Sequence, residues 1–520
     1  MKHSANNYMK STSQHLYLHV AAVLLLCQVV VAGNGVTRVS GPSPFPAGCD
    51  GENTQQKNYE NAEVEAWLAR DPTNPDHFVG VYQQDRWSGG GCHGVMAAVT
   101  PDRGRTWTRS FAHFDRCEGG SASNGGNFAR DSDPWVTISP DGTVFQSTLS
   151  FDTSDANEAM LVSLSTNGGN TWTEPTTLLY DSDPTVVDDA DHITADPIHN
   201  GYVYTIWSRY VYNDANKDIL LSSPLWLART IDGGTTWEAP RVIYTPPPGL
   251  YVGSHQILAL PDGTLVDIFN QYDASSNINY MMSSTDQGVT WSSPVHINRE
   301  DDIGVIDVKT GELVREGEGN LAVSPTTGQL YFVWMDARFS GGVRNGIVFS
   351  TSTDGGLTWS PPVQVNQAPS VQAFGPNIAV TRNGRIAITY YDFRNDNSDP
   401  NVLLTNYWRI TSKDGGQTWD EIPLSSPFDL RSAPYSTGYM VTDYEGLVAT
   451  GEKFLEFFVL ANSGDTLNPT DVFATTTEKG VASAGQSREH VEINFRPRSV
   501  MEQWHPLSDH FVTLAQRPFQ

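Results

Sequence analysis

Arginine and aspartate residues occur together just after several predicted strands. The segments concerned are Asp85-Arg86, Asp336-Ala337-Arg338, Asp392-Phe393-Arg394 and, after a fourth strand, Arg209. A guanidinium group binds a carboxylate through two parallel hydrogen bonds, so several arginines around one pocket would clamp an anionic ligand. We therefore take Arg86, Arg338 and Arg394 as candidate substrate ligands, with Arg209 in reserve. For each of them an ordinary salt bridge that locks a loop is the alternative.

Carboxylates also occur where the same units begin, and two of these candidates suit proton transfer. A carboxylic acid enclosed among arginines and other carboxylates can act as general acid on a glycosidic oxygen, and Asp85 and Asp133 are candidates for that role. Trp67 and Trp135 occupy equivalent positions in two units. Near a pocket they would form a platform that stacks on a sugar ring, and packing in the core is the alternative.

A short turn pattern organises the elements that must position these residues. The pattern Ser/Thr-x-Asp-x-Gly-x-Thr-Trp occurs six times, with Asn167 in place of the Asp once, and its copies end at Trp107, Trp172, Trp237, Trp291, Trp359 and Trp419. The Asp can accept hydrogen bonds from backbone N–H groups just ahead of it, and the Gly supplies a position with positive φ. The Trp adds a large buried ring. We expect these turns to stabilise the fold rather than to form the active site.

The six turns resemble the Asp-box (BNR) repeats of the sialidase (neuraminidase) superfamily, whose members are β-propellers. The resemblance runs from about Asn61 to Thr477. It implies an all-β propeller in which each box lies between the third and fourth strands of a blade, away from the catalytic face. It also implies a Tyr nucleophile assisted by a Glu, for which Tyr444 and Glu445 are the nearest match, with a packed or loop-capping Tyr as the alternative.

The sequence departs from the family pattern in two respects. Sialidases carry a Phe/Tyr-Arg-Ile/Leu-Pro motif near the start of the catalytic domain, and residues 63–69 contain none. Sialidase domains usually have six blades, whereas seven predicted second strands are visible here: 79–83, 144–149, 203–207, 265–269, 330–334, 386–390 and 454–459. The seventh unit lacks a fourth strand, and residues 36–42 resemble one. We predict seven blades, with six as the alternative, closed by this N-terminal strand.

The remaining sequence features concern location and partners. Residues 1–32 resemble a secretory signal with an apolar run over 20–31, which predicts a secreted protein free of the membrane after cleavage. We expect the propeller over 33–477 and a C-terminal extension of undefined role over 478–520. The 32 basic and 59 acidic residues give a formal charge of −27, which argues against a nucleic-acid partner.

Three cysteines would remain after removal of the signal that contains Cys27. One disulfide and one free thiol among Cys49, Cys92 and Cys117 is the simplest arrangement, and the sequence does not specify the pair. No cofactor is expected. A structural calcium ion could bind the side-chain oxygens of one acidic stretch, and a solvated loop is the alternative interpretation of that stretch. Its residues are Asp181, Asp183, Asp188, Asp189 and Asp191.

Together these features predict a secreted, exo-acting, sialidase-like glycoside hydrolase. Its partner would be a carbohydrate or glycoconjugate that carries an acidic sugar such as sialic acid. One alternative is another carbohydrate-active propeller such as a polysaccharide lyase, in which a Tyr or His removes a proton beside a uronate. A second alternative is a non-catalytic propeller that binds glycans or proteins.

Overall fold

The computed structural model describes residues 35–52, 54–153 and 156–475, which all belong to one compact unit. The proposed signal over 1–32, Cys27 and the extension over 478–520 lie outside these described residues. Strands dominate the described chain, and its helical elements are the 3-10 turns η1 (Arg338–Ser340) and η2 (Leu430–Ser432). None of its helices is long and apolar enough to cross a membrane.

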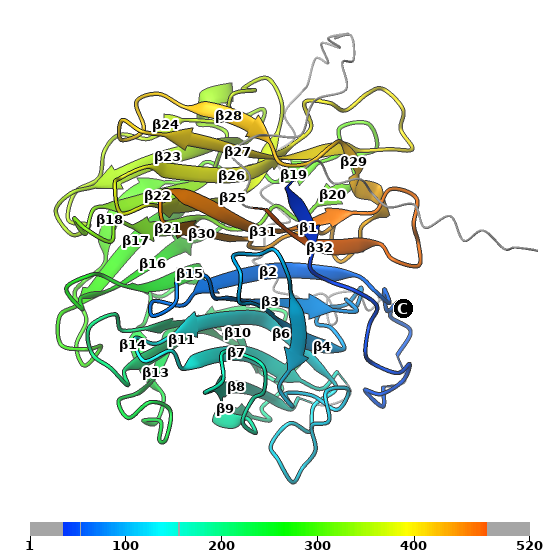
Figure 1. Ribbon diagram of the computed structural model, residues 1–520, viewed down its shortest axis with the longest axis vertical. Coiled ribbons are helices and arrows are strands. Elements are labelled where there is room, and N and C mark those ends of the chain that lie inside the picture. The colour runs from blue at the N-terminus through cyan, green and yellow to red at the C-terminus, as the bar shows by residue number, and fades with distance from the viewer. Residues whose placement is uncertain (1–34, 53, 154–155, 476–520) are drawn as a thin grey trace, which may run out of the picture. The chain divides into compact units, whose positions relative to one another are not determined.

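Within the described residues, the strands form seven antiparallel blades of four principal strands each (Figure 1). Blade one consists of β2 (Glu63–Arg70), β3 (Phe78–Gln84), β4 (Gly94–Thr100) and β5 (Thr108–Phe111), and blade two of β6 (Arg130–Ile138), β7 (Val144–Phe151), β8 (Glu158–Ser165) and β9 (Thr176–Asp181). Blade three consists of β10 (Val186–Ala195), β11 (Val203–Tyr212), β13 (Leu225–Thr230) and β14 (Arg241–Tyr244), and blade four of β15 (Tyr251–Ala259), β16 (Leu265–Tyr272), β17 (Asn277–Ser284) and β18 (Val295–Arg299).

Blade five consists of β21 (Asn320–Val323), β22 (Leu330–Asp336), β23 (Gly346–Ser352) and β24 (Val363–Gln364). Blade six consists of β25 (Ala373–Val380), β26 (Ile386–Asp392), β27 (Leu404–Ser412) and β28 (Asp420–Pro423). Blade seven consists of β30 (Gly446–Thr450), β31 (Lys453–Ala461), β32 (Thr470–Thr475) and β1 (Val36–Arg38). Short accessory strands are β12 (Leu220–Ser222), β19 (Val305–Ile306), β20 (Leu313–Val314) and β29 (Phe428–Asp429). All seven predicted second strands fall inside observed strands.

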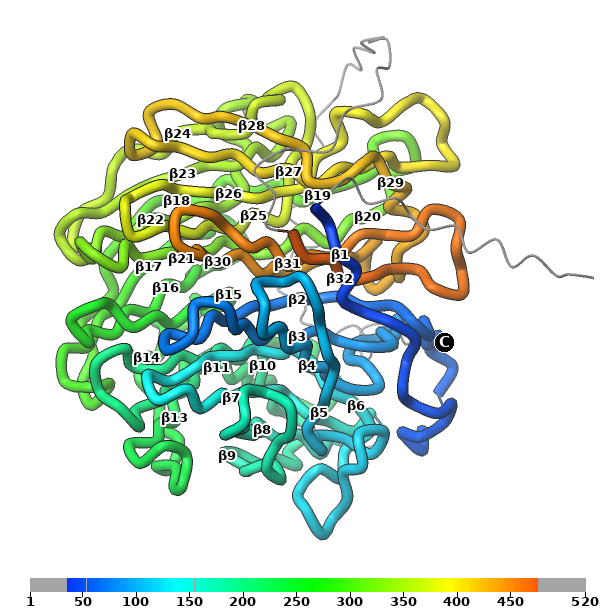
Figure 2. Tube along the Cα trace, viewed as in Figure 1, coloured from blue at the N-terminus to red at the C-terminus, as the bar shows by residue number. Residues whose placement is uncertain are grey.

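The first strands of the blades form the inner ring of the propeller. Each contacts the first strand of the next blade, and β30 of the seventh blade contacts β2 of the first. Figure 2 follows the chain from blade to blade in sequence order, from blue through green to orange. The predicted seven-bladed, all-β propeller is therefore confirmed.

The N-terminal strand closes the ring, as the sequence predicted. β1 pairs antiparallel with β32, with Val36 opposite Thr475 and Arg38 opposite Phe473. Ser40 Oγ adds a hydrogen bond of 2.7 Å to Asp471 Oδ1. β1 thus supplies the fourth strand of the last blade and covers an edge that would otherwise be unpaired.

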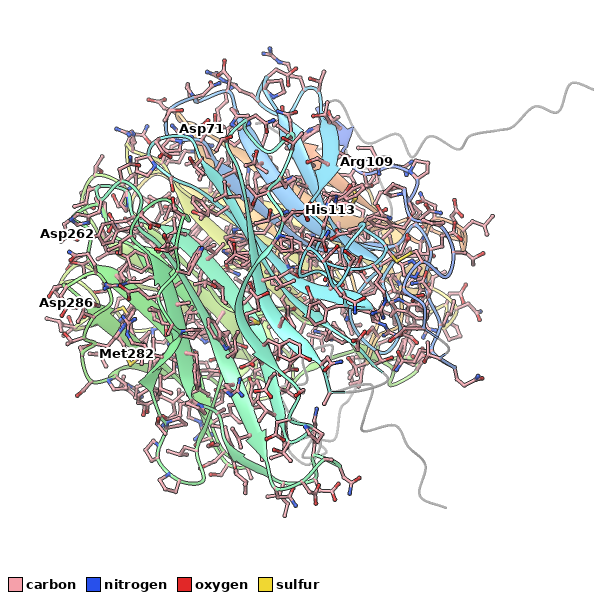
Figure 3. The ribbon with its side chains drawn as sticks, turned by 90° about the horizontal axis from the view of Figure 1, so that it is seen from below. Asp71, Arg109, His113, Asp262, Met282 and Asp286 are labelled. Carbon is pink, nitrogen blue, oxygen red and sulfur yellow. A yellow bond between two sulfur atoms is a disulfide. The ribbon has the colours of Figure 1, made fainter. Side chains whose placement is uncertain are left out.

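The six repeated turns lie between the third and fourth strands of blades one to six, and their hydrogen bonds explain the pattern. In the copy at 284–291, Asp286 Oδ1 accepts from Thr290 N at 2.8 Å, and Asp286 Oδ2 accepts from the Thr290 hydroxyl at 2.6 Å. Gly288 takes a positive φ of 79° and donates its N–H to Ser284 Oγ at 2.9 Å. Figure 3 shows Asp286 at the periphery, so these turns stabilise the outer edge of the blades.

Candidate active site

A bulge recurs in the inner strands and determines which side chains point toward the axis. The register shifts within β2, β6, β10, β15 and β25. Each bulge contains one residue with positive φ, and these residues are Glu65, Asp133, Ala190, Ser254 and Gly375. A bulge redirects neighbouring side chains, so the repeated bulges gather polar groups from different blades around the propeller axis.

Tyr444 and Glu65 form the central contact of this cluster. The Tyr444 hydroxyl lies 3.2 Å from Glu65 Oε2 and 3.4 Å from the Pro134 carbonyl oxygen. Both side chains are buried. Burial, followed by the charge of Glu65, raises the pKa of Tyr444 well above its ordinary value, so a nearby base must accept its proton before the phenol can attack. Glu65 is placed to be that base.

Glu65 is held in position by a buried amide and a buried arginine. Gln83 Nε2 donates to Glu65 Oε2 at 2.5 Å, and Arg86 Nη1 lies 3.2 Å from Glu65 Oε1. Arg86 also donates to Gln83 Oε1 at 2.6 Å and to Ser436 Oγ at 3.2 Å. The side chain of Arg86 is fully buried. Arg86, predicted as a substrate ligand, is therefore placed behind Glu65, where it orients and neutralises that carboxylate.

Further carboxylates surround the Tyr444–Glu65 pair. The charges of Asp133, Asp191 and Asp443 all act on Tyr444. Burial first, and then the charges of Asp443 and Asp133, raise the pKa of Glu318 to about 8. At neutral pH Glu318 therefore keeps a proton that it can donate to a leaving group. Asp133 accepts a hydrogen bond from Ala190 N at 3.3 Å.

A cavity of about 30 Å³ adjoins Glu318, and carboxylates from blades four and five line it. Its polar lining consists of Ser254, His255, Asn270, Asn279, Glu300, Asp302, Glu316 and Glu318. The Ser254 hydroxyl donates to Glu318 Oε1 at 2.9 Å. Burial, followed by the neighbouring His192, lowers the pKa of His255 well below its ordinary value, so this imidazole is neutral.

The two tryptophans predicted as a sugar platform contact each other. Their rings stack with centroids 3.7 Å apart, and Trp135 lies 4.9 Å from the Tyr444 ring. Trp135 is 4% exposed and belongs to a core cluster. Trp67 and Trp135 therefore act as packing that positions Tyr444, rather than as an open stacking surface.

The structure does not bring two other predicted catalytic residues to Tyr444. Asp85 accepts from the Ser43 hydroxyl at 2.5 Å and from Asn61 N at 2.8 Å, so it anchors the segment that precedes β2. Glu445 accepts from the Tyr391 hydroxyl at 2.6 Å within the core of the sixth and seventh blades. The Glu next to Tyr444 in space is Glu65, not its sequence neighbour.

The remaining predicted arginines are also held apart, each by an ion pair with an aspartate close to it, and Arg209 additionally pairs with Asp181 at the end of β9 in the second blade. The ion pairs are Arg209–Asp188 at 2.6 Å, Arg338–Asp336 at 2.6 Å and Arg394–Asp392 at 2.7 Å. No three-arginine clamp is therefore assembled from Arg86, Arg338 and Arg394. The arginine that the structure adds near the axis is Arg315, whose Nε donates to Asp443 Oδ1 at 3.0 Å.

Two residues of this centre could have been selected from the sequence. Glu65 lies near the start of the first strand β2 and Glu318 just before the first strand β21, the positions that gather on one face of a propeller. Arg315 gives no such signal, because its approach to Asp443 depends on the hairpin β19–β20. The acidic stretch considered for calcium is divided, since Asp188 binds Arg209 whereas the charge of Asp191 acts on Tyr444.

Comparisons with known proteins add a sequence relative. No family model matches the chain. The chain is 26% identical over 345 residues to a sialidase of Micromonospora viridifaciens, a match that covers 58% of this chain and 47% of the relative. The match thus spans about half of the relative's length.

The chain also matches solved structures at low sequence identity. A leech intramolecular trans-sialidase has 13% identity and a TM-score of 0.42, with 85% of this chain and 98% of that chain covered. A Fusarium graminearum α-L-arabinofuranosidase has 12% identity and a TM-score of 0.42, with 69% and 93% covered. The sequence match to a sialidase, the six repeated turns and the propeller fold fit the sialidase superfamily.

Proposed function

We propose that the chain is a glycoside hydrolase in which Tyr444 attacks the anomeric carbon of a terminal sugar. The observation that carries this proposal is the contact of 3.2 Å between the Tyr444 hydroxyl and Glu65 Oε2. As the bond from Tyr444 oxygen to the anomeric carbon forms, Glu65 takes the phenol proton. The glycosidic bond breaks, and Glu318 donates its proton to the leaving oxygen. Water then releases the sugar in the reverse sequence.

The first substrate class we propose is a sialoside, removed from the end of a glycan. Two things support it: the Micromonospora viridifaciens relative is a sialidase, and Arg315 lies near the axis where it could meet a carboxylate. We further propose that residues 1–32 act as a signal peptide that directs export of the protein.

A second candidate is a hydrolase of neutral glycosides. It is favoured by the excess of carboxylates at the axis, where Glu65, Asp133 and Asp443 act on the Tyr444 site. Arg315 already pairs with Asp443, so an anionic sugar would have to displace that carboxylate.

Hydrolysis of an aryl sialoside and of neutral aryl glycosides, in parallel, tests both candidates. We expect Tyr444→Phe to abolish turnover and Glu65→Gln to reduce kcat by about 10²–10⁴-fold. Tyr390→Phe is the matched control, because the Tyr390 hydroxyl also binds a glutamate, Glu421, but within the sixth blade.

Three outcomes would contradict the proposal. Turnover unchanged in both axial variants would place the active site elsewhere. Products that absorb in the ultraviolet would indicate a lyase. Ligand affinity without any turnover would indicate a binding protein.

A further inference from the structure

Three carboxylates form a buried group outside the Tyr444 site. Asp115 and Glu118 lie in the connection between β5 and β6, and Asp131 lies in β6. One oxygen of each can be chosen so that all three lie within 4.8 Å of one another. The three residues are at most 1% exposed. Three carboxylates this close and this well buried require a compensating positive charge or protons.

The protein itself satisfies this group only in part. Backbone N–H groups of Val95 and Phe114 donate to the two oxygens of Glu118 at 2.7 and 2.9 Å, and Glu118 N donates to Asp115 Oδ1 at 2.9 Å. These contacts fix the orientation of two carboxylates. Asp115 Oδ2 and both oxygens of Asp131 have no hydrogen-bond partner at normal distance among the described residues, and the groups that interact with the Asp131 carboxylate are the Glu118 carboxyl and the Ser150 hydroxyl. The three carboxylates likewise form no ion pair with a described Arg, Lys or His.

A fourth oxygen ligand is available from the neighbouring strand. Ser150 lies directly opposite Asp131 in the pairing of β6 with β7, and its hydroxyl faces that carboxylate. Ser150 is fully buried, and its Oγ has no hydrogen-bond partner at normal distance within the described structure. The Ser150 hydroxyl is uncharged and lies on a different strand from the three carboxylates. A buried hydroxyl directed at them is therefore a second observation, separate from the acidic cluster itself, that indicates a ligand.

The donor set determines which ligand fits. All available atoms are oxygens, which hard cations prefer. Two oxygens that each lie about 2.4 Å from one calcium ion can be at most about 4.8 Å apart, and one oxygen from each of the three carboxylates lies within that limit of the others. Magnesium prefers to keep several of its waters, and a closed site accommodates them poorly. We propose that Asp115, Glu118 and Asp131, together with the Ser150 hydroxyl, bind one calcium ion.

The location of the site indicates what the ion would do. Glu118 follows Cys117, which forms a disulfide with Cys49, so the ion would fasten this cross-linked loop to the inner strand β6. β6 also carries Asp133, two residues from Asp131. Room for Glu118 depends on Gly94, because a Cβ there would lie 2.8 Å from Glu118 Cγ. Calcium would therefore stabilise the first two blades and the strand that bears Asp133.

Metal content and thermal unfolding of the mature protein test the proposal directly. After dialysis against EGTA, we expect added calcium to restore about one ion per chain and to raise the unfolding midpoint, with magnesium having a much smaller effect. Wild-type protein that binds no calcium, and whose midpoint does not depend on calcium, would overturn the proposal. This measurement requires no variant to fold.

Variants then locate the ion. Asp131→Asn should lose both the bound calcium and the calcium-dependent shift of the midpoint. Asp267→Asn is the matched control and should keep both, because Asp267 is equally buried and unpartnered but lies alone in β16. Calcium retained at full stoichiometry and affinity by a folded Asp131→Asn variant would refute the assignment.

Discussion

Replacing Arg86 by Met should show that this arginine supports Glu65 rather than binding substrate. In the structure the Arg86 and Glu65 side chains are both 0% exposed, with Nη1 and Oε1 3.2 Å apart. Met has similar length but no charge. The variant therefore leaves the Glu65 carboxylate buried without its cation, while the packing around the side chain stays nearly filled.

The size of the effect follows from this geometry. Breaking a buried ion pair by removing one partner costs about 3–5 kcal/mol, because the remaining charge stays desolvated. Neutralising the other partner as well should recover most of that cost, so the double variant Arg86→Met/Glu65→Gln should be more stable than Arg86→Met alone. A surface arginine that only contacts substrate would instead cost less than about 0.5 kcal/mol.

Urea unfolding followed by tryptophan fluorescence measures these free energies, with Glu65→Gln as the second single variant of the cycle. A loss of less than about 1 kcal/mol in Arg86→Met would refute the reasoning, since it would mean that the carboxylate is not isolated by burial. The same conclusion would follow if the double variant were no more stable than Arg86→Met. A raised KM with unchanged stability would return Arg86 to the role of substrate ligand.

Two further predictions concern the N-terminal region. Burial disfavours the charged form of His93, but hydrogen bonds to Asp50 and Asp85 outweigh this and raise its pKa from 6.5 to about 9. Charged His93 therefore stabilises the fold fully below about pH 6.5 and loses this contribution as the pH rises through about 9, so His93→Gln should reduce the fall in Tm between pH 7 and pH 10. A chain that starts at Ser40 lacks β1 and exposes the edge of β32, so its Tm should be lower and its light scattering on heating higher than those of a chain that starts at Gly33. An unchanged pH profile, or equal Tm values for the two chains, would contradict these expectations.

Much of the fold could be predicted because its signals are local. The hydrogen bonds of the turn at 284–291 lie within eight residues, so the sequence pattern and the structure coincide there. The strand that closes the ring could also be found, since residues 36–42 resemble the segments that follow the repeated turns. Sequence similarity between units was enough to assign β1 to a blade whose other strands lie at the far end of the described chain.

The site was harder to predict because its contacts are long-range and depend on geometry. Sequence adjacency suggested Glu445 as the partner of Tyr444. The two residues lie in the segment just before β30, where Tyr444 contacts Glu65 of the first blade and Glu445 accepts a hydrogen bond from Tyr391 in the core. The arginines that follow second strands were expected to converge. Arg209, Arg338 and Arg394 instead form ion pairs with nearby aspartates, and Arg86 pairs with Glu65, so each guanidinium is already held by a carboxylate of the fold.

The sequence by itself determined the repeating unit: strand, turn, strand, and a hydrogen-bonded turn before the fourth strand, six times in full and a seventh time in part. These features depend on residues within about ten positions of one another, where composition and spacing are sufficient. Only the tertiary structure decided that Tyr444 meets Glu65, since 379 residues separate them. That contact arises because ring closure places the last blade against the first and because the inner-strand bulge turns Glu65 toward the axis.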